Sequence, residues 1–151
     1  MTRWLVANTV NVKGGKIEYD IPERPLLHCC SAEDPFGDVR LDIRPEVKPD
    51  VVHDVTEKLP FENDSFKACF ADFPWINAWK WKSARAIREM LRVAPVVYTI
   101  SPWLYGAKIC HPDPIYISQR PGINVPILFV KYVRNEEKFW KEFKERTEEK
   151  I

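Results

Sequence analysis

The chain has 151 residues, of which 45% are hydrophobic, so it can bury one core but is too short for two ordinary domains. Its 23 basic and 22 acidic residues leave a net charge of +1, which excludes the overall basic excess of a general nucleic-acid binder or of a protein held at a membrane surface. A partner that carries phosphates would have to meet a local basic patch. We predict a single domain over residues 1–151.

We expect neither a membrane span nor a secretory signal in this sequence. No segment approaches the roughly 18 apolar residues that a spanning helix needs. The first residues are interrupted by Asn8 and lack a small-residue cleavage site, so we expect a cytoplasmic protein with no membrane partner. The four cysteines form no CxxC pair, and we expect buried small side chains rather than a zinc site or a disulfide at Cys29, Cys30, Cys69 and Cys110. No metal is predicted.

The first half of the chain predicts short strands. Residues 1–22 alternate around Lys13-Gly14-Gly15, which indicates an N-terminal β-hairpin. Four apolar runs that end in polar residues follow, as is typical of buried parallel strands: Leu26–Cys30, Val39–Ile43, Val51–Asp54 and Ala68–Asp72. Residues 31–38, about eight in number, are fewer than the dozen that a helical crossover needs. The first helix of the fold is therefore expected to be reduced to a loop or a single turn.

The second half adds helices to the strands. Residues 79–94 have helical spacing, with Ala84, Ile87, Leu91 and Ala94 on one face, and Pro95 ends this helix. Further strands are predicted at Val96–Ile100, Ile115–Ile117 and Ile127–Val133. A C-terminal amphipathic helix is predicted over residues 135–150, with Asn135 as its N-cap and with Phe139, Trp140 and Phe143 on one side. Strands alternating with helix indicate an α/β fold.

Three aspartates, Asp42, Asp54 and Asp72, each close a predicted strand. Ligands of an open parallel sheet bind beyond the carboxyl ends of its strands. Asp42 is placed to accept hydrogen bonds from both hydroxyls of a ribose, and Asp54 could accept the exocyclic amine of an adenine. Taken alone, each is better explained as a cap of the following turn. Their joint placement favours a nucleoside pocket.

From Leu26 to Trp75, the order and spacing of these pieces resemble the class I S-adenosylmethionine-dependent methyltransferases. The subgroup is the one whose fourth strand ends in Asp-Pro-Pro-Tyr/Trp or Asn-Pro-Pro-Tyr. The matching pieces are Pro49–Asp54, Leu59–Phe66 with its LPF-x-x-x-SF pattern, and the tetrapeptide Asp72-Phe73-Pro74-Trp75. Weaker similarity continues to Arg134. The resemblance implies a Rossmann-like methyltransferase fold over residues 26–134, with a mostly parallel central sheet and an antiparallel last strand.

The resemblance also implies a cofactor and a reaction. The cofactor is S-adenosylmethionine, and the residues that it implies as cofactor contacts are His28, Cys29, Cys30, Ser31, Asp42, Ile43, Asp54, Val55, Phe61 and Asp72. The reaction is methylation of an exocyclic amino nitrogen, for which Asp72 and the carbonyl of Phe73 each accept one N–H. Pro74 completes this catalytic tetrapeptide, and Trp75 stacks on a base turned out of its strand.

The chain departs from the family pattern at two places. Phe73 stands where the family has Pro, which removes the restraint on the turn that aims the carbonyl. Ser31 stands where a glycine is expected in the loop after the first strand, and Gly37 is the only glycine of that loop. The basic residues near the predicted helix are interpreted either as its solvated face or as a local patch for nucleic acid: Lys80, Lys82, Arg85, Arg88 and Arg92.

The leading hypothesis is a methyltransferase that acts on N6 of adenine in DNA. DNA is preferred to RNA as the partner. A separate target-recognition segment does not fit in the chain, so specificity would be relaxed or would come from a homodimer or a partner. Two alternatives stay open. The acceptor is RNA, a protein or a small molecule, or the chain is a non-catalytic module that binds a nucleoside or S-adenosylmethionine.

Overall fold

The computed structural model describes residues 21–118 and 127–149, together with residues 12, 13, 16, 17, 122, 124 and 125. Its elements, in chain order, are β1 (Val12–Lys13), β2 (Lys16–Ile17), β3 (Leu26–Cys29), β4 (Val39–Asp42), the 3-10 helix η2 (Pro45–Val47), β5 (Val51–Val52), β6 (Ala68–Asp72), α1 (Ala78–Val93), β7 (Val96–Ser101), β8 (Cys110–Ser118), β9 (Ile127–Arg134) and α2 (Glu136–Glu149).

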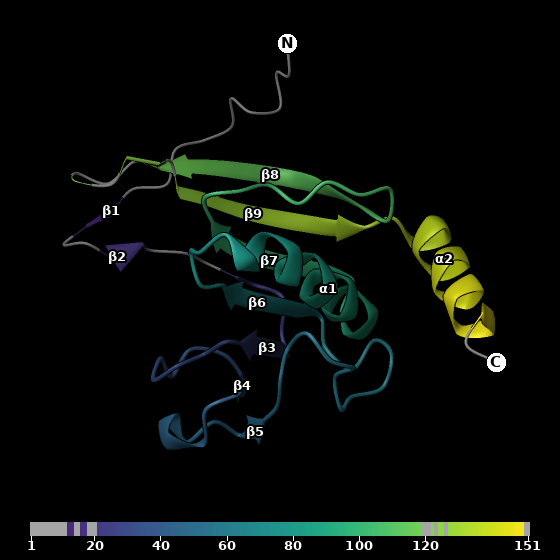
Figure 1. The fold of residues 1–151 in the computed structure, drawn as a ribbon, viewed down its shortest axis with the longest axis horizontal. Coiled ribbons are helices and arrows are strands. Elements are labelled where there is room, and N and C mark those ends of the chain that lie inside the picture. The colour runs from purple at the N-terminus through teal and green to yellow at the C-terminus, as the bar shows by residue number, and fades with distance from the viewer. Residues whose placement is uncertain are drawn as a thin grey trace, which may run out of the picture.

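One sheet of seven strands organises the molecule, in the order β5-β4-β3-β6-β7-β9-β8 (Figure 1). The strands from β5 to β7 in this order pair in parallel. β9 is antiparallel to both of its neighbours, β7 and β8. The predicted mostly parallel sheet with an antiparallel last strand is confirmed. The chain runs outward from β3 to β5 and returns to β6 on the other side of β3, so the order reverses there and opens a crevice at the strand ends.

A loop without a helix joins the adjacent parallel strands β3 and β4, as the short spacing predicted. Asp38 fixes its end, because the N–H of Leu26 donates to Asp38 Oδ2 over 2.7 Å and the N–H of Asp38 donates to the carbonyl of Leu26 over 2.9 Å. Gly37 precedes it with φ +106°, and a Cβ there would lie 2.9 Å from the Cβ of His28. Both the conformation and the space therefore require glycine.

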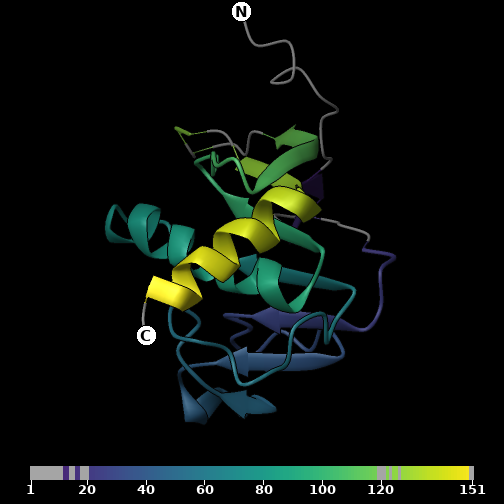
Figure 2. The same ribbon diagram turned by 90° about the vertical axis from the view of Figure 1, so that its right-hand side faces the viewer.

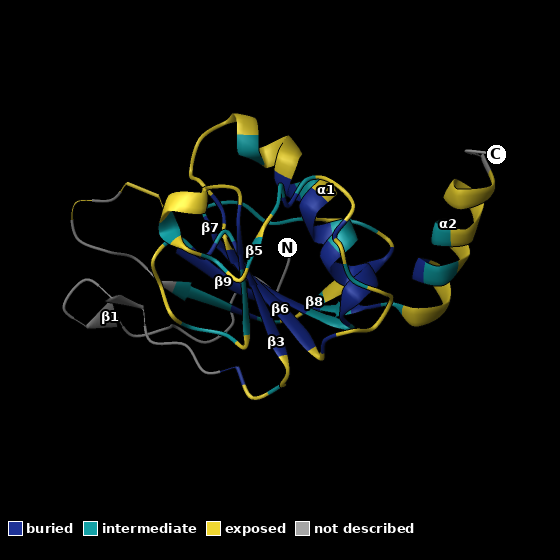
Figure 3. Cartoon of the chain, turned by 90° about the horizontal axis from the view of Figure 1, so that it is seen from below, coloured by how far each residue is buried: buried dark blue, intermediate teal, exposed yellow. Residues whose placement is uncertain are grey.

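Both faces of the sheet are buried. α1 covers one face, where Ala86, Ile87, Met90 and Leu91 are buried against the strands (Figures 1 and 3). Of the four residues predicted to share the buried face, Ile87, Leu91 and Ala94 are buried, whereas Ala84 is only partly buried, because the buried face is turned toward Ala86 and Met90. Successive side chains of a strand point to opposite faces. The opposite face accordingly carries a second buried cluster that includes Leu26, Ala68, Phe70, Tyr98, Ile100 and Phe129.

β8 is longer than predicted. It spans the nine residues Cys110–Ser118, whereas the sequence indicated only Ile115–Ile117. Pro112 and Pro114 argue against a strand in the sequence, because proline cannot donate a hydrogen bond to a neighbouring strand and is confined to edge strands and bulges. Here β8 is the edge strand, and its register with β9 shifts between Pro112 and Ile115. The prolines thus fall where the ladder tolerates them.

Arg92, on the last turn of α1, holds the loop between β5 and β6. Its guanidinium is buried and donates to Glu89 Oε1 over 2.6 and 2.9 Å. It also donates to the carbonyls of Leu59 and Phe61 and to the side-chain oxygen of Asn63, over 3.0, 2.9 and 2.9 Å. Arg92 is therefore a structural residue and not part of a solvated basic face.

α2 crosses the end of the sheet near the C-terminal half of α1 (Figure 2). Buried Arg134 anchors its start, donating to the carbonyl of Leu91 over 2.7 Å and pairing with Asp64 over 2.7 Å and with Glu136. The predicted C-terminal helix is confirmed, beginning at Glu136, one residue after its predicted start, and continuing to Glu149, the last described residue. The Asn135 side chain bonds the carbonyl of Lys108 and the ring of His111.

The structure bears on two further predictions, the N-terminal hairpin and the absence of a membrane-spanning helix. In the N-terminal hairpin, β1 and β2 pair antiparallel, with Val12 opposite Ile17 and Lys13 opposite Lys16. The other residues of that prediction up to residue 20 lie outside the described part. Neither α1 nor α2 is long and apolar enough to cross a membrane, and these are the α-helices of the described residues.

Candidate active site

A cavity of about 930 Å³ opens at the carboxyl ends of β3, β4, β5 and β6. Its volume lies within the range of about 300–1,000 Å³ that is usual for small-molecule sites. The residues that line it are Cys30, Ala32, Leu41, Asp42, Ile43, Arg44, His53, Asp54, Val55, Thr56, Asp72, Phe73, Pro74, Trp75, Trp79 and Lys82. All four residues of the tetrapeptide and both of the earlier strand-end aspartates are brought together here.

The turn after β3 keeps a glycine-like backbone without glycine. Cys30 and Ala32 have φ of +52° and +47° and stand on either side of buried Ser31, the position where a glycine was expected. The left-handed conformation costs a residue with a Cβ about 1–2 kcal/mol. The N–H of Ser31 donates to the carbonyl of Leu41 over 3.2 Å, and this bond helps to hold the turn against that cost.

Asp42 ties the turn to β4. Its carboxylate accepts the N–H of Ala32 over 2.8 Å at Oδ2, and the N–H and Nε of Arg44 over 2.9 and 3.2 Å at Oδ1. Burial alone would raise the pKa of Asp42, but these hydrogen bonds outweigh it and lower the pKa. A carboxylate offers about four acceptor positions, of which three are used. A bond to both hydroxyls of a ribose would therefore require the half-exposed Arg44 side chain to move away.

Asp54 caps the turn that follows β5. Its Oδ1 accepts the N–H and the hydroxyl of Thr56 over 2.9 and 2.7 Å, which lowers the pKa of Asp54. Within the described residues no donor bonds its Oδ2. Asp42 and Asp54 both accept the N–H two residues on, so the turn-cap interpretation is confirmed, and both also line the cavity.

Two further groups characterise the wall beside these aspartates. The ring Nε2 of His53 is buried and has no hydrogen-bond partner among the described residues. Such an atom at a cavity wall is a place for a polar group of a ligand. Burial and the charges of Asp42, Asp72 and Asp54 raise the pKa of the Cys30 thiol to about 12. Cys30 therefore stays a neutral thiol and is no nucleophile.

The tetrapeptide stands at the end of β6. Asp72, its first residue, is exposed at the strand end, and Trp75 is 36% exposed at the cavity. The Phe73 side chain turns inward and stacks on Trp79 of α1, with ring centroids 5.7 Å apart and an angle of 22° between the planes. This stacking anchors the turn to α1.

Four residues that the resemblance implied as cofactor contacts do not line the cavity. His28 faces the opposite side of the sheet, where its Nδ1 bonds the carbonyl of Phe36 over 2.7 Å. Cys29 is buried in the core under α1, and Ser31 is buried within the turn. Phe61 packs edge-to-face on Phe66 in the loop that Arg92 holds.

The structure adds seven lining residues that sequence reasoning missed, namely Ala32, Leu41, Arg44, His53, Thr56, Trp79 and Lys82. For two of them a signal was present. Arg44 and Thr56 each stand two residues after a strand-end aspartate, which is the spacing of an Asx turn. Trp79 and Lys82 are one turn apart on α1, and the Lys82 ammonium lies 5.6 Å from the ring centroid of Trp79. Their role depends on packing that no local pattern records.

Solved structures share this architecture. The N-methyltransferase NodS from Bradyrhizobium japonicum WM9 matches with a TM-score of 0.52 and 13% identity, over 74% of this chain and 86% of its own. The chain has the Rossmann-like methyltransferase fold. A second match of this fold, in the complex between the Haloferax volcanii Trm112 methyltransferase activator and the putative methyltransferase, has a TM-score of 0.51 and 12% identity, over 72% of this chain and 81% of the other. The sequence matches no family model and no curated protein.

Proposed function

We propose that this protein is an S-adenosylmethionine-dependent methyltransferase that acts on an exocyclic amino nitrogen of a nucleobase, with N6 of adenine in DNA as the leading acceptor. One observation carries the proposal. Asp72 and Trp75 of the tetrapeptide line the same cavity as the strand-end carboxylates Asp42 and Asp54, in a chain with a methyltransferase fold. A cavity of this kind offers one end to a nucleoside and the other to a planar acceptor.

The cavity wall fits the cofactor. The nucleoside half of S-adenosylmethionine carries hydroxyls and an amino group, which need hydrogen-bond acceptors, and a ring nitrogen, which needs a donor. The wall offers the unbonded Oδ2 of Asp54 among the described residues, the remaining acceptor position of Asp42, and the buried Nε2 of His53. When bound, the cofactor supplies a methyl group on a positively charged sulfur, and the nearby carboxylates favour that charge.

The tetrapeptide supplies hydrogen-bond acceptors that would make an exocyclic amino nitrogen more nucleophilic. The lone pair of such a nitrogen is delocalised into the ring, so the nitrogen is a weak nucleophile. Asp72 accepts one N–H of the amino group and the backbone carbonyl of Phe73 accepts the other, which draws the lone pair back onto nitrogen. Trp75, which is 36% exposed, offers a flat face for stacking on a base that has left its strand. Holding the acceptor in line supplies much of the remaining rate.

The acceptor is therefore planar and reaches the site unpaired. An unstacked base meets both conditions, and it meets them more readily than a protein side chain does. We accordingly propose nucleic acid, with DNA preferred to RNA, as the partner. Homodimerisation would supply further recognition surface.

Replacing Asp72 by Ala separates catalysis from binding. Transfer of a tritiated methyl group should fall by at least about 100-fold, the scale of losing a positioned hydrogen-bonding group. Cofactor affinity, measured by calorimetry, should stay within about threefold, because Asp42 and Asp54 remain. Glu137→Ala, which removes an exposed carboxylate from α2, is the matched control and should change neither quantity. Wild-type protein that binds the cofactor but labels no DNA, RNA or protein would show a non-catalytic binding module.

A further inference from the structure

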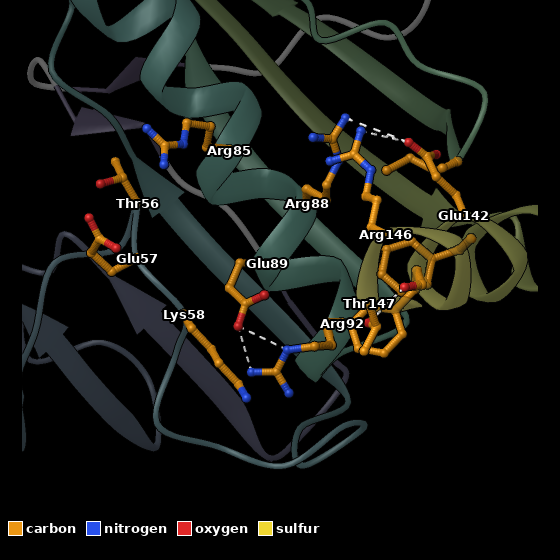
Figure 4. Close-up of a pocket in the computed structure, with 13 residues that line it drawn as sticks. Thr56, Glu57, Lys58, Arg85, Arg88, Glu89, Arg92, Glu142, Arg146 and Thr147 are labelled. Atoms are coloured by element: carbon orange, nitrogen blue, oxygen red, sulfur yellow. Dashed lines mark hydrogen bonds and ion pairs between the residues drawn. The ribbon is translucent and has the colours of Figure 1, made fainter. Parts of the chain in front are cut away.

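A second cavity of about 650 Å³ lies between α1, α2 and the loop at residues 56–58, and we call it the α1–α2 groove (Figure 4). It is lined by Thr56, Glu57, Lys58, Arg85, Arg88, Glu89, Arg92, Ile109, Phe139, Glu142, Phe143, Arg146 and Thr147. Thr56 also lines the candidate active site, so the two cavities meet at this residue. The groove therefore adjoins the active-site cavity on the side of Thr56 and is lined by α1 along its length.

The groove carries more positive charge than its carboxylates neutralise. Arg88 and Arg146 share one carboxylate oxygen, Glu142 Oε1, at 3.9 and 2.8 Å (Figure 4). The Nε of Arg88 is buried and has no partner within the described residues. Arg85 and Lys58 form no ion pair with any described side chain. Arg92 differs from them, because all five of its guanidinium donors bond described groups, namely Glu89, Asn63 and two loop carbonyls.

An exposed aromatic side chain, that of Trp81, precedes these arginines on α1, on the side of the chain nearer the tetrapeptide. Trp81 is 82% exposed and stands one helical turn before Arg85, with Arg88 on the next turn. Ile76, 59% exposed, and Trp75 lie in the segment between the strand end and α1. From Trp81 to Arg88 the helix rises about 10 Å, which equals three steps of a stacked strand at about 3.4 Å each.

We propose that Trp81, Arg85 and Arg88, together with Lys58 and Arg146, form a binding track for the single-stranded DNA that flanks the target base. Trp81 stacks on a neighbouring base, and the guanidiniums contact the phosphates that follow. The inference rests on the proposed function and names where its substrate is held. It also supplies the local basic patch that a chain with a net charge of +1 needs in order to meet phosphates.

The chemistry of the track favours nucleic acid over a protein partner. Five cationic side chains line the groove against three carboxylates, an excess of positive charge that the phosphates of a nucleic acid would neutralise, and the ring of Trp81 stands in line with the arginines of α1. A free aromatic face serves an unpaired base better than a duplex, whose bases are already stacked. A single strand is therefore the occupant that uses both the ring and the cations.

The test is binding of a fluorescent single-stranded oligonucleotide, followed by anisotropy, with full-length variants checked for an unchanged circular dichroism spectrum. Trp81→Ala should weaken binding by about 10-fold, while Trp81→Tyr keeps a stacking face and should stay within about twofold. Arg85→Glu should weaken binding by about 5–10-fold and lower the slope of log affinity against log salt by about one. Lys141→Glu makes the same charge change on an exposed position of α2 outside the groove and should bind like wild type, apart from a small general effect of net charge.

The outcomes separate this inference from the proposed function. Two outcomes would overturn the proposed binding track, even if the protein transfers methyl groups to free nucleosides. In the first, the wild-type protein does not bind the oligonucleotide. In the second, Trp81→Ala and Arg85→Glu both bind it as tightly as the wild type does. A protein partner that loses affinity with these two variants while the oligonucleotide does not also overturns it. Binding that depends on the track in a protein that transfers no methyl group refutes the proposed function and leaves the track standing.

Discussion

Replacing Arg92 by Met should destabilise the fold strongly although Arg92 belongs to the same run of basic residues as Arg85. The Arg92 guanidinium makes five hydrogen bonds, two to Glu89 and three to loop oxygens. Met fills a similar volume but leaves the carboxylate of Glu89, whose side chain is 19% exposed, without its counter-charge, and leaves two loop carbonyls without a donor. Breaking a buried pair in this way costs about 3–5 kcal/mol.

That loss is large for this chain. A domain of this size has a free energy of unfolding of about 5–15 kcal/mol. For a domain of about 150 residues, each kcal/mol lowers Tm by about 2–4 °C, so Tm should fall by about 6–20 °C. The assay is urea unfolding followed by circular dichroism, with Tm from a thermal scan. Arg85→Met on the exposed face of α1 is the control and should change the free energy of unfolding by less than about 0.5 kcal/mol.

A double variant sharpens the test. With Met at both positions 89 and 92, no unpaired charge is buried, so part of the lost stability should return, although the N–H of Leu59, which donates to Glu89 over 2.8 Å, also loses its acceptor. Loss of less than about 1 kcal/mol in Arg92→Met would refute the structural role assigned to this arginine, since it would mean that the loop finds other partners.

Three further predictions concern the loop after β3 and the strand-end aspartate Asp42. Ala32→Gly should raise the free energy of unfolding by up to about 1 kcal/mol in urea titrations, because it relieves a left-handed alanine with φ +47°; a decrease would show that the turn is not strained. Gly37→Ala should lower it by about 2 kcal/mol or more, while Gly106→Ala, which meets no atom within 4 Å, should be nearly neutral; equal effects would contradict the clash with His28. The pKa of Asp42 is lowered by folding, so its contribution is present above the unfolded pKa of about 3.9 and is lost as pH falls through the folded value. The gap in stability between wild type and Asp42→Asn should therefore shrink below about pH 4, and a constant gap would argue against an ionised, hydrogen-bonded carboxylate.

Much of the fold could be predicted because short apolar runs record burial directly. The strands at Leu26–Cys29, Ala68–Asp72 and Val96–Ser101 lie in the middle of the sheet. Each corresponds to a mostly apolar run of sequence that is bounded by polar residues. The short spacing before Val39 correctly excluded a helical crossover. By contrast, the length of β8 could not be predicted, because its prolines are tolerated only by virtue of an edge position that is set by the whole sheet.

The candidate site was predictable where chemistry follows a strand end. Asp42, Asp54 and the tetrapeptide all reach one cavity, since carboxyl ends of parallel strands share an edge. The side to which a strand residue points was harder, as His28 shows by facing away from the cavity. Contributions from α1 were not visible, because only the tertiary packing brings Trp79 against Phe73.

The basic residues of α1 show the same limit. Sequence alone could not separate a solvated face from a binding patch, and the structure divides the run into different roles. Arg92 holds a loop, Lys82 lies over Trp79 at the cavity, and Arg85 and Arg88 line the α1–α2 groove. Helical position and burial, rather than residue type, decide between these roles.

Nucleoside analysis of methylated product tests the central claim most directly. Wild-type protein is incubated with tritiated S-adenosylmethionine and a panel of single- and double-stranded DNA and RNA, and the nucleosides are then separated. The account predicts label in N6-methyladenine, most of it from single-stranded DNA, and none with Asp72→Ala. Label found only in protein, or label that persists without Asp72, would contradict it.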